Sequence, residues 1–373
     1  MTMIDLPAST DAVIGTAAVP VYRLTQGTTD LTQRFQGRLI SLTLTDNRGF
    51  EADQLDIELD DADGLLDLPE KGATLSLALG WQDTGVVDKG QYKVDELEHA
   101  GPPDRLTIRA RSVDLSGGMV TRKERSFRGQ TLGAIIGAIA AQNDLAAVVA
   151  SALAGLVIDH IDQTGESDAN FLTRLAKDHD AIATVKQGRL LFIPTGAAQS
   201  ASGIPLPTVE ITRASGDTHS FLIADRENYN GVKAYYQDAR QATRGEVVVD
   251  AANAVKVADK PGPDQKKTVA DVLAHADPDN VKVLRHTYAT KANAERAARA
   301  EWQRIQRGVA SFRITLARGR PELLPELPAV VNGWKAEIDG TGWVLAKVTH
   351  EYSGRGYTSM LEMEVKTVDS AER

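Results

Sequence analysis

The chain has 373 residues, of which 42% are hydrophobic and 25% are charged, a composition typical of a soluble globular protein with two or three domains. Its formal net charge is −9, so its surface repels a phosphate backbone, and direct DNA or RNA binding is disfavoured. There is no cysteine, which excludes disulfides, thiolate nucleophiles and cysteine metal sites. The start of the chain, MTMIDLPASTDAVIG, lacks a cationic beginning and a continuous apolar core, so we expect no signal peptide there.

The first third of the chain alternates apolar and polar residues with a period of two. Leu42 and Leu44 alternate with threonines, and the same pattern runs through LDIELDD (55–61), TLSLALGW (74–81) and RLTIRARS (105–112). Such alternation is typical of antiparallel strands that have one face on a core and one in water. Short strands of this kind, separated by turn residues, predict a small barrel or sandwich.

The middle of the chain changes to helical spacing from about Gln130. The basic stretch VTRKERSFRG (120–129) precedes it, and we expect a solvated loop entering a helix there, with a nucleic-acid contact as the alternative. The apolar run 132–158 is interrupted by the polar triplet QND (142–144). It therefore predicts two buried helices joined by a polar turn rather than a membrane span.

Residues 162–179, DQTGESDANFLTRLAKDH, surround an apolar stripe with acids, a histidine and two cations. They could form a catalytic or metal-binding cluster, but the pattern favours the start of a helix. Ser167 is the predicted N-cap, and Asp168 follows in the first turn, where its charge suits the helix dipole. The side expected to be buried comprises Phe171, Leu172, Leu175, His179 and Ile182; the exposed side comprises Arg174, Lys177 and Asp178, of which Arg174 and Asp178 can pair weakly.

The second half of the chain mixes strands with one strong helix. A hairpin is predicted at 183–194 with its turn at Gln187 and Gly188, and the small-residue segment 195–205 is a linker candidate. The helix is KANAERAARAEWQRIQRG (291–308), which ends with Gly308 at a C-cap position. The other predicted elements are strands at 208–216 and 229–238, an exposed loop at 258–268, and period-two strands at 312–316, 344–348 and 361–365.

Two β segments far apart in the chain resemble each other. QYKVDELEHAG (91–101) aligns with GWVLAKVTHEY (342–352) without a gap, and upstream LGW (79–81) matches NGW (332–334) at nearly the same spacing. Two matches in the same order predict a duplicated barrel. The aligned pairs are Tyr92 with Trp343, Val94 with Leu345, Leu97 with Val348, and His99 with His350.

The acidic loop LDDADGLLDLPE (59–70) partly fits a calcium-binding loop. With Gly64 at loop position six, three acids fall on ligand positions, but Leu59 occupies position one and offers no side-chain oxygen. We therefore expect a charged turn that closes a hairpin. The three acids are Asp61, Asp63 and Glu70.

Two further groups of residues are candidate sites. One is a possible metal cluster, although it lacks H-E-x-x-H or a related spacing, and a buried core histidine is the expected role of its member His179. The other is the pair Asp60 and Asp61, which could cleave a glycoside, yet adjacent strand residues point to opposite faces. Motifs for nucleophiles, phosphate loops and dinucleotides are absent from the sequence, so we expect no catalytic, cofactor-binding or metal-binding residue and no cofactor. The possible metal cluster comprises His160, Asp162, His179 and Asp180.

Five blocks, in order along the chain, carry a resemblance to a known family. They are 41–61, 161–196, 225–236, 285–302 and 342–364. Together they resemble the late control gene D proteins of contractile-tailed bacteriophages, which are baseplate or tail hub proteins. The N-terminal part of type VI secretion spike proteins is similar in arrangement.

The resemblance implies a homotrimer in which each subunit contributes two related barrels, giving a pseudo-sixfold ring. Such a ring adapts a sixfold tail tube above to a threefold trimeric spike below. Its other implied partners are tape-measure and baseplate wedge proteins, and DNA passes through the channel without specific binding. The resemblance implies no membrane insertion. It places the protein in the tail baseplate of a virion, or in a phage-tail-like particle, after assembly in the cytoplasm of the bacterial host.

The family reading makes the chain a structural protein rather than an enzyme. The particle type stays open between phage, prophage, phage-tail-like bacteriocin and secretion system. The alternatives are a tail-associated cell-wall-degrading enzyme and a nucleic-acid-binding regulator. The expected fold is α+β and mainly β, with two related antiparallel barrels and a peripheral α+β domain. The expected domains are a first barrel at 1–115, a peripheral domain at 116–205 and 241–308, and a second barrel at 206–240 and 309–373.

Overall fold

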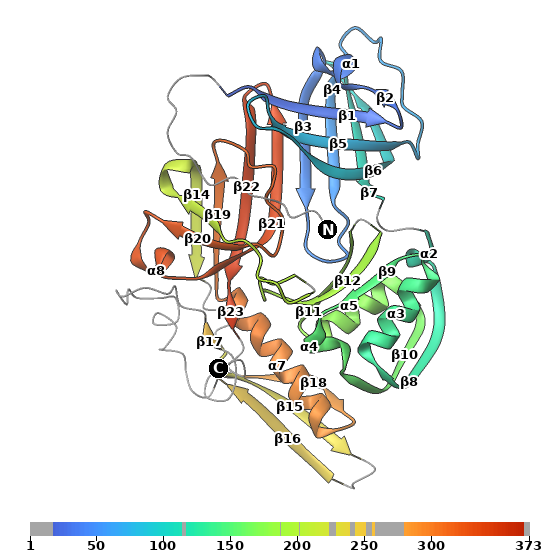
Figure 1. Cartoon of the computed structure of the whole chain (residues 1–373), viewed down its shortest axis with the longest axis vertical. Helices are drawn as coiled ribbons and strands as arrows, with labels where there is room; N and C mark the ends of the chain where they lie inside the picture. The colour runs from blue at the N-terminus through green and yellow to red at the C-terminus, as the bar shows by residue number, and fades with distance from the viewer. Residues whose placement is uncertain are drawn as a thin grey trace.

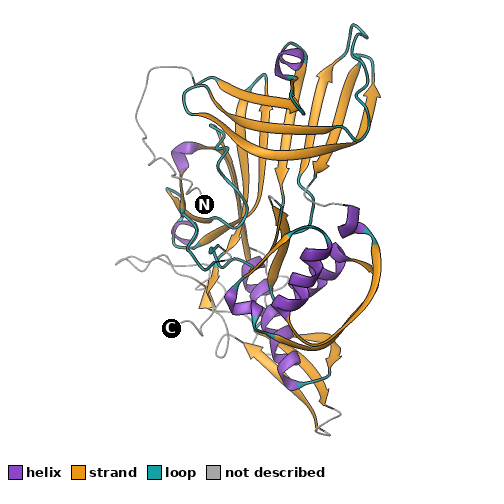
Figure 2. Cartoon of the chain, turned by 45° about the vertical axis from the view of Figure 1, so that its right-hand side comes forward, coloured by secondary structure: helices purple, strands orange, loops and turns teal. Residues whose placement is uncertain are grey.

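The computed structural model describes residues 18–113, 117–186, 188–200, 202–223, 229–238, 243–250, 256–257 and 280–368. Strands predominate and build two adjoining barrels, whereas most of the helices lie in smaller units at the other end of the molecule (Figure 1, Figure 2). The fold is therefore α+β and mainly β, as predicted, with two related antiparallel barrels and peripheral α+β material.

The first barrel is built from the N-terminal alternating segments, whose apolar residues face inward. Leu24, Leu42, Leu44, Leu55 and Ile57 are fully buried in its core. Its elements are β1 (Pro20–Gln26), β2 (Thr29–Asp30), α1 (Thr32–Gln36), β3 (Leu39–Asp46), β4 (Gln54–Asp60), β5 (Thr74–Trp81), β6 (Gly85–Ala100) and β7 (Arg105–Ser112).

The second barrel takes its strands from two separate stretches of the chain. Its core is centred on Trp343, which is fully buried and whose indole N–H donates to the carbonyl of Ile338 at 3.0 Å. Its elements are β13 (Val209–Thr212), η1 (Arg213–Ser215), β14 (Gly216–Ile223), β19 (Ala310–Leu316), β20 (Pro328–Asn332), α8 (Ala336–Asp339), β21 (Trp343–Ser353) and β22 (Gly356–Val365).

The two barrels share one strand order, which agrees with the repeat predicted from the sequence. The first runs β1-β5-β6-β7-β4-β3, and the second runs β13-β20-β21-β22-β19-β14. β6 therefore corresponds to β21 and β3 corresponds to β14. Register shifts recur at matching places: between Val94 and Glu96 in β6 and between Leu345 and Lys347 in β21. One difference is that β1 is antiparallel to β5, whereas β13 is parallel to β20.

The second sequence match, LGW with NGW, is displaced by one residue in the structure. Leu75 lies opposite Tyr92, and Ala329 lies opposite Trp343, the partner of Tyr92 in the repeat. In the alignment of the two barrels that strand pairing gives, Trp81 therefore corresponds to Lys335 rather than to Trp334.

The peripheral part contains two units, each with its own core. One packs α3 and α5 against short sheets, and the other packs α7 against a three-stranded sheet. The first unit comprises α2 (Gly117–Val120), β8 (Arg122–Thr131), α3 (Leu132–Gln142), β9 (Ala146–Val149), α4 (Ser151–Ala154), β10 (Val157–Ser167), α5 (Asp168–Asp178), β11 (Ala181–Lys186) and β12 (Arg189–Pro194). The second comprises β15 (Gly231–Asp238), β16 (Thr243–Asp250), β18 (Val281–Tyr288) and α7 (Lys291–Gly308), and the short strands β17 (Lys256–Val257) and β23 (Thr367–Val368) pair beside it.

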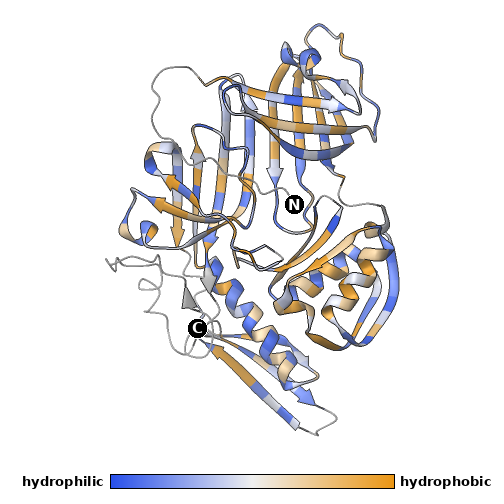
Figure 3. Cartoon of the chain, viewed as in Figure 1, coloured by the Kyte–Doolittle hydropathy of each residue, from blue (hydrophilic) through white to orange (hydrophobic). Residues whose placement is uncertain are grey.

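Several expectations for the middle of the chain are wrong. The stretch 120–129 is not a loop, because most of it belongs to β8, which pairs along β10 in a hydrophilic ribbon (Figure 3). The run 132–158 contains only one long helix, α3, because the following β9 adds in parallel to β12. α5 ends sooner than expected: His179 is its C-cap residue, and Ile182 lies in β11.

Other details differ at element ends and in the grouping of strands. β15, expected within the 206–240 part of the second barrel, pairs instead with β16 and β18 and packs against α7. Gly308 is the last residue of α7, and Val309 is the C-cap residue. The hairpin β11–β12 is confirmed, although Gln187 in its turn, like the loop 258–268, lies outside the described residues. Among the helices that the structure describes, none has the length and apolar character needed to span a membrane.

Candidate functional site

The junction between the barrels is a strand-to-strand seam. β3, at the edge of the first barrel, pairs antiparallel with the second half of β21, from Ser41 opposite Ser353 to Asp46 opposite Val348. One hydrogen-bonded sheet therefore runs through both barrels without a break. The packing is shared as well, because Tyr357 of β22 belongs to the core of the first barrel and lies 5.5 Å from the ring of Trp81.

A buried ion pair lies at the end of this seam. Lys89 Nζ of β6 is 2.8 Å from Asp46 Oδ2, and the two side chains are only 2% and 5% exposed. The same ammonium donates to the carbonyl of Pro321, in the loop between β19 and β20, at 3.2 Å. Lys89 thus connects β6 to β3 within the first barrel and also contacts a loop of the second barrel.

His350 is the buried histidine beside that pair. Its Nδ1 lies 2.8 Å from Ser359 Oγ and 3.0 Å from the Tyr357 hydroxyl. Burial and the charge of Lys89 lower the pKa of His350 well below 6.5, so the ring is neutral at pH 7. A neutral imidazole contacts the hydroxyls of Ser359 and Tyr357 without adding a second positive charge beside Lys89.

Further ion pairs attach the surrounding elements to the barrels. Arg48, in the loop after β3, reaches into the second barrel, where its Nε is 2.5 Å from Glu326 Oε1. Because these partners come from different units, each pair fixes a relative position as well as a local fold. The pairs are Arg48 with Glu326 and Glu364, Lys186 with Asp53, and Arg307 with Asp180.

A groove of about 410 Å³ lies among these ion pairs, between α5, β11 and α7. Its lining mixes both signs of charge, and Arg48 and Arg307 are already paired with acids. Most of the charged groups in this lining are therefore already engaged in ion pairs within the protein. The charged lining residues are Arg48, Glu51, Lys177, Asp180, Arg304, Arg307 and Glu364.

Two of the three acids considered as calcium ligands, in the loop after β4, have partners within the protein. Asp61 is buried: its Oδ1 accepts the N–H of Leu66 at 2.9 Å, and its Oδ2 lies 3.2 Å from His99 Nε2. Asp63 pairs with Arg38 at 2.6 Å. Asp60, the last residue of β4, is exposed, whereas Asp61, just after the strand, is buried, so the two carboxylates lie in different environments.

The four residues considered as a metal cluster are divided between separate contacts. His160 and Asp162 pair with each other at 3.1 Å on the exposed side of β10. His179 is buried at the end of α5, and Asp180 pairs with Arg307. Across the described ranges, no group of three or more His, Asp or Glu side chains is arranged to hold a metal ion.

The segment 162–179 does begin a helix, but Asp168 has a larger role than the sequence indicates. Ser167 Oγ accepts the N–H of Asn170 at 3.2 Å, which confirms the predicted N-cap. Arg174 pairs with Glu166 rather than with Asp178, and its guanidinium lies over the ring of Phe171.

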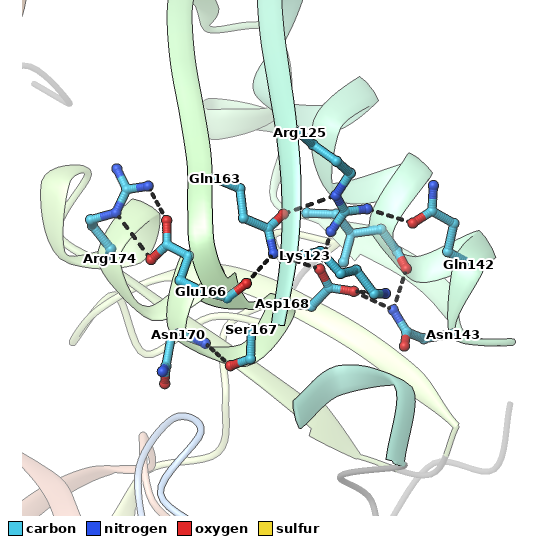
Figure 4. Close-up of polar contacts among 11 residues, drawn as sticks. Lys123, Arg125, Gln142, Asn143, Gln163, Glu166, Ser167, Asp168, Asn170 and Arg174 are labelled. Atoms are coloured by element: carbon cyan, nitrogen blue, oxygen red, sulfur yellow. Dashed lines mark hydrogen bonds and ion pairs between the residues drawn. The ribbon is translucent and has the colours of Figure 1, made fainter. Parts of the chain in front are cut away.

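Asp168 is fully buried at the centre of a polar network (Figure 4). Lys123 Nζ is 2.6 Å from its Oδ2, Asn143 Nδ2 donates to the same oxygen at 2.9 Å, and Gln163 Nε2 donates to Oδ1 at 3.0 Å. Arg125 completes the network as an ion pair with Oδ1. This arrangement joins β8, α3, β10 and α5 through one carboxylate.

Sequence reasoning missed this network because the basic stretch was expected to be a loop. A signal was present: Lys123 and Arg125 are two residues apart, and on a strand they share one face. Two cations on one face of a strand indicate a carboxylate partner, although the sequence alone does not name it.

His179 gives a pH-dependent contribution to stability. Burial, with a smaller contribution from Arg296, lowers its pKa from 6.5 to about 4. Between these values the unfolded chain binds a proton that the folded chain does not, so stability is full above pH 6.5 and declines as pH falls towards 4. We expect the free energy of unfolding of a His179→Gln variant to fall by about 1.5 kcal/mol less than that of the wild type between pH 6.5 and pH 5.

Urea unfolding of both proteins at the two pH values measures this difference. His160→Gln is the matched control, because His160 is exposed on β10. Parallel pH profiles for the wild type and His179→Gln would contradict the assignment.

These features define a class of protein built from two related β-barrels that are joined through a shared sheet. The family model of the phage tail baseplate hub (GPD) matches residues 40–356. The chain therefore belongs to the phage tail baseplate hub family, and the resemblance to late control gene D proteins is confirmed.

Relatives and solved structures agree with this assignment. A probable baseplate hub protein of Escherichia phage 186 is 47% identical over 370 residues, and one of Escherichia phage P2 is 45% identical over 369; each match covers 95% of both chains. A tail protein from Neisseria meningitidis MC58 has a similar structure, with a TM-score of 0.65 at 13% identity over 93% of this chain and 96% of that one. At that identity the likeness concerns the fold alone.

Proposed function

We propose that three copies of this chain form a pseudo-sixfold ring that adapts a sixfold tail tube to a threefold spike in a contractile tail or related particle. The observation that carries the proposal is the pair of barrels with one strand order, fused through β3 and β21. Three copies of two equivalent barrels supply six similar positions around a threefold axis. The proposed partners are a tube protein on one face, a trimeric spike on the other, and tape-measure and wedge proteins around them.

The face of the shared sheet that points away from the barrel cores has a charge pattern that favours passage of DNA without binding. On β4, β6 and β7 this face carries alternating acids and arginines, among which Arg109 contacts Glu96 and Glu98. Because the arginines are engaged by more numerous carboxylates, such a surface repels phosphate rather than binding it. The residues are Asp56, Glu58, Asp95, Glu96 and Glu98 with Arg105, Arg109 and Arg111.

The role is structural and requires no catalytic residue. We propose that the chain works without enzymatic activity in the baseplate, after assembly in the host cytoplasm. Clearing of a peptidoglycan zymogram by the purified chain would overturn this part and favour a cell-wall hydrolase.

Native mass spectrometry tests the ring. We expect a species with three times the mass of the 40.1 kDa chain, and a threefold particle with six lobes in negative-stain images. A monomer across the micromolar range under mild conditions would contradict the trimeric ring. The measurement is independent of which surfaces join the subunits.

A further inference from the structure

The seam between β3 and β21 has a counterpart that a single chain leaves unformed. The strand equivalent to β3 is β14, and the strand equivalent to β21 is β6. Among the described residues, β14 pairs only with β19. On the side of β6 that faces β5, backbone pairing ends at Val94, whose N–H and carbonyl bond to Ala73 and Gly72. The rest of β6, up to Ala100, therefore presents an open edge in this part of the structure.

The equivalence of β3 and β14 extends to individual residues. β3 shifts register against β4 between Leu39 and Ser41, and β14 shifts against β19 between Gly216 and Thr218. Matching the two shifts, and the strands beside them, fixes the correspondence. It places Leu42 with His219, Thr43 with Ser220, Leu44 with Phe221, Thr45 with Leu222, and Asp46 with Ile223.

Burial differs between the formed seam and its counterpart. Leu42, Leu44, Val348 and His350 are all fully buried in the formed seam. Their equivalents are less covered: His219 is exposed, Phe221 and Leu97 are half-buried, and the His99 side chain is 44% exposed. Leu222, on the other face of β14, is 60% exposed. The same residue positions are thus fully buried where the seam exists and more exposed where it does not.

We infer that β14 of one subunit pairs antiparallel with the end of β6 in a second copy of this chain, repeating the β3–β21 seam between subunits. Transfer of the known register places Leu97 opposite Ile223, Glu98 opposite Leu222, His99 opposite Phe221, and Ala100 opposite Ser220. The contact joins different surfaces of the two copies, so a ring forms when the rotation closes, which is the trimer of the proposed function on which this inference rests.

The pairing would also remove two unpaired sheet edges. An open edge bearing an exposed leucine is a site for unwanted strand addition, and closure is the way that β proteins abolish such edges. On the inner face, the side chains of Leu97 and Ile223 would meet, and His99 would lie against Phe221. The second contact repeats the pairing of His350 with Leu44 within one chain, whereas Ile223 stands where the formed seam has Asp46 opposite Val348.

Cysteine cross-linking tests the register, since the native chain has no cysteine to interfere. In the double variant Glu98→Cys with Leu222→Cys, the two residues would be directly opposite, at a Cα separation of roughly 4.5–5.5 Å that a disulfide accepts. Oxidation should give covalent dimers and trimers on a non-reducing gel. The matched control is Glu98→Cys with Ser220→Cys, whose diagonal separation of about 7–8 Å is too long.

Mixing the single variants Glu98→Cys and Leu222→Cys, one with a larger tag, shows that the bond joins different chains. A tagged–untagged dimer supports the seam. Equal cross-linking by the matched and diagonal pairs, or none by the matched pair, overturns it. If the wild type is a trimer in native mass spectrometry and the matched pair still fails, the seam is wrong while the ring stands; a wild-type monomer removes both.

A charge variant gives a second readout without oxidation. Leu222 is exposed in the chain, so Leu222→Glu should fold normally, as far-UV circular dichroism would check. Opposite Glu98 it adds like charges at each subunit contact, and we expect trimer dissociation to be favoured on the order of tenfold. Adding Glu98→Lys should restore the trimer. An unchanged trimer in Leu222→Glu, or no restoration by the second substitution, contradicts the register.

Discussion

Replacing Asp168 by alanine is expected to destabilise the first peripheral unit by about 3–5 kcal/mol, because it leaves buried cations without their counter-ion. The carboxylate is fully buried and accepts contacts from Lys123, Arg125, Asn143 and Gln163. Removing it would leave hydrogen-bond donors from three elements without their acceptor. Hydrogen exchange of peptides from α3 and α5, measured by mass spectrometry, should show a loss of protection that corresponds to this decrease in the free energy of unfolding.

The control for this variant is Asp162→Ala, which removes a half-exposed carboxylate from β10, the strand that precedes α5. We expect that change to stay within about 0.5 kcal/mol of the wild type. Burial raises the pKa of Asp168, but hydrogen bonds from Lys123, Gln163 and Asn143 and the charge of Arg125 outweigh it, so the pKa is lowered. The stabilisation is therefore present above the unfolded pKa of about 3.9 and is lost as pH falls through the folded value. Equal protection in both variants would contradict the role of the network.

Lys89→Met is expected to weaken the junction of the two barrels by about 3–5 kcal/mol. The substitution keeps an apolar stem but leaves the carboxylate of Asp46 buried beside His350, without the ammonium at 2.8 Å. It also removes the donor to the carbonyl of Pro321. Guanidinium unfolding followed by tryptophan fluorescence measures the loss, because Trp81 and Trp343 report on the first and second barrels respectively.

A double-mutant cycle separates the pair from local packing. Asp46→Leu removes the stranded charge, so combining it with Lys89→Met should recover much of the stability lost in the single variant. We expect a coupling of at least about 1 kcal/mol between the two positions. Lys93→Met, on the exposed side of the same strand, is the matched control and should change little. Additive effects of the two substitutions would show that the ion pair does not hold the junction.

The strands of the barrels could be predicted from the sequence because their two faces meet different environments. Leu55, Ile57 and Leu59 face a core while the acids between them face water, so alternation is written into the residues. α7 could also be predicted from the sequence, since its Ala- and Arg-rich composition favours a helix locally. The duplication was visible because β6 and β21 retain matching apolar positions.

The errors arise where tertiary pairing decides the local structure. AAVV (146–149) is a short apolar run that suits a helix or a strand, and its pairing with β12 decides the outcome. β8 buries little except Phe127, so its charged residues hide the strand pattern. The partners of Asp168 are distant in sequence, and only the alignment of β8 with β10 brings Lys123 and Arg125 to it. The subunit seam is likewise visible only when the two barrels are compared in three dimensions.

The sheet that crosses both barrels also has a mechanical consequence. In the β3–β21 seam, main-chain hydrogen bonds lie across the strand direction, from Ser41 opposite Ser353 to Asp46 opposite Val348. A force that pulls one barrel along the strands loads all of these bonds together, whereas a force that peels the strands apart breaks them one after another. The seam therefore resists sliding more strongly than opening, and the ion pair of Lys89 and Asp46 strengthens one of the two ends from which peeling can start.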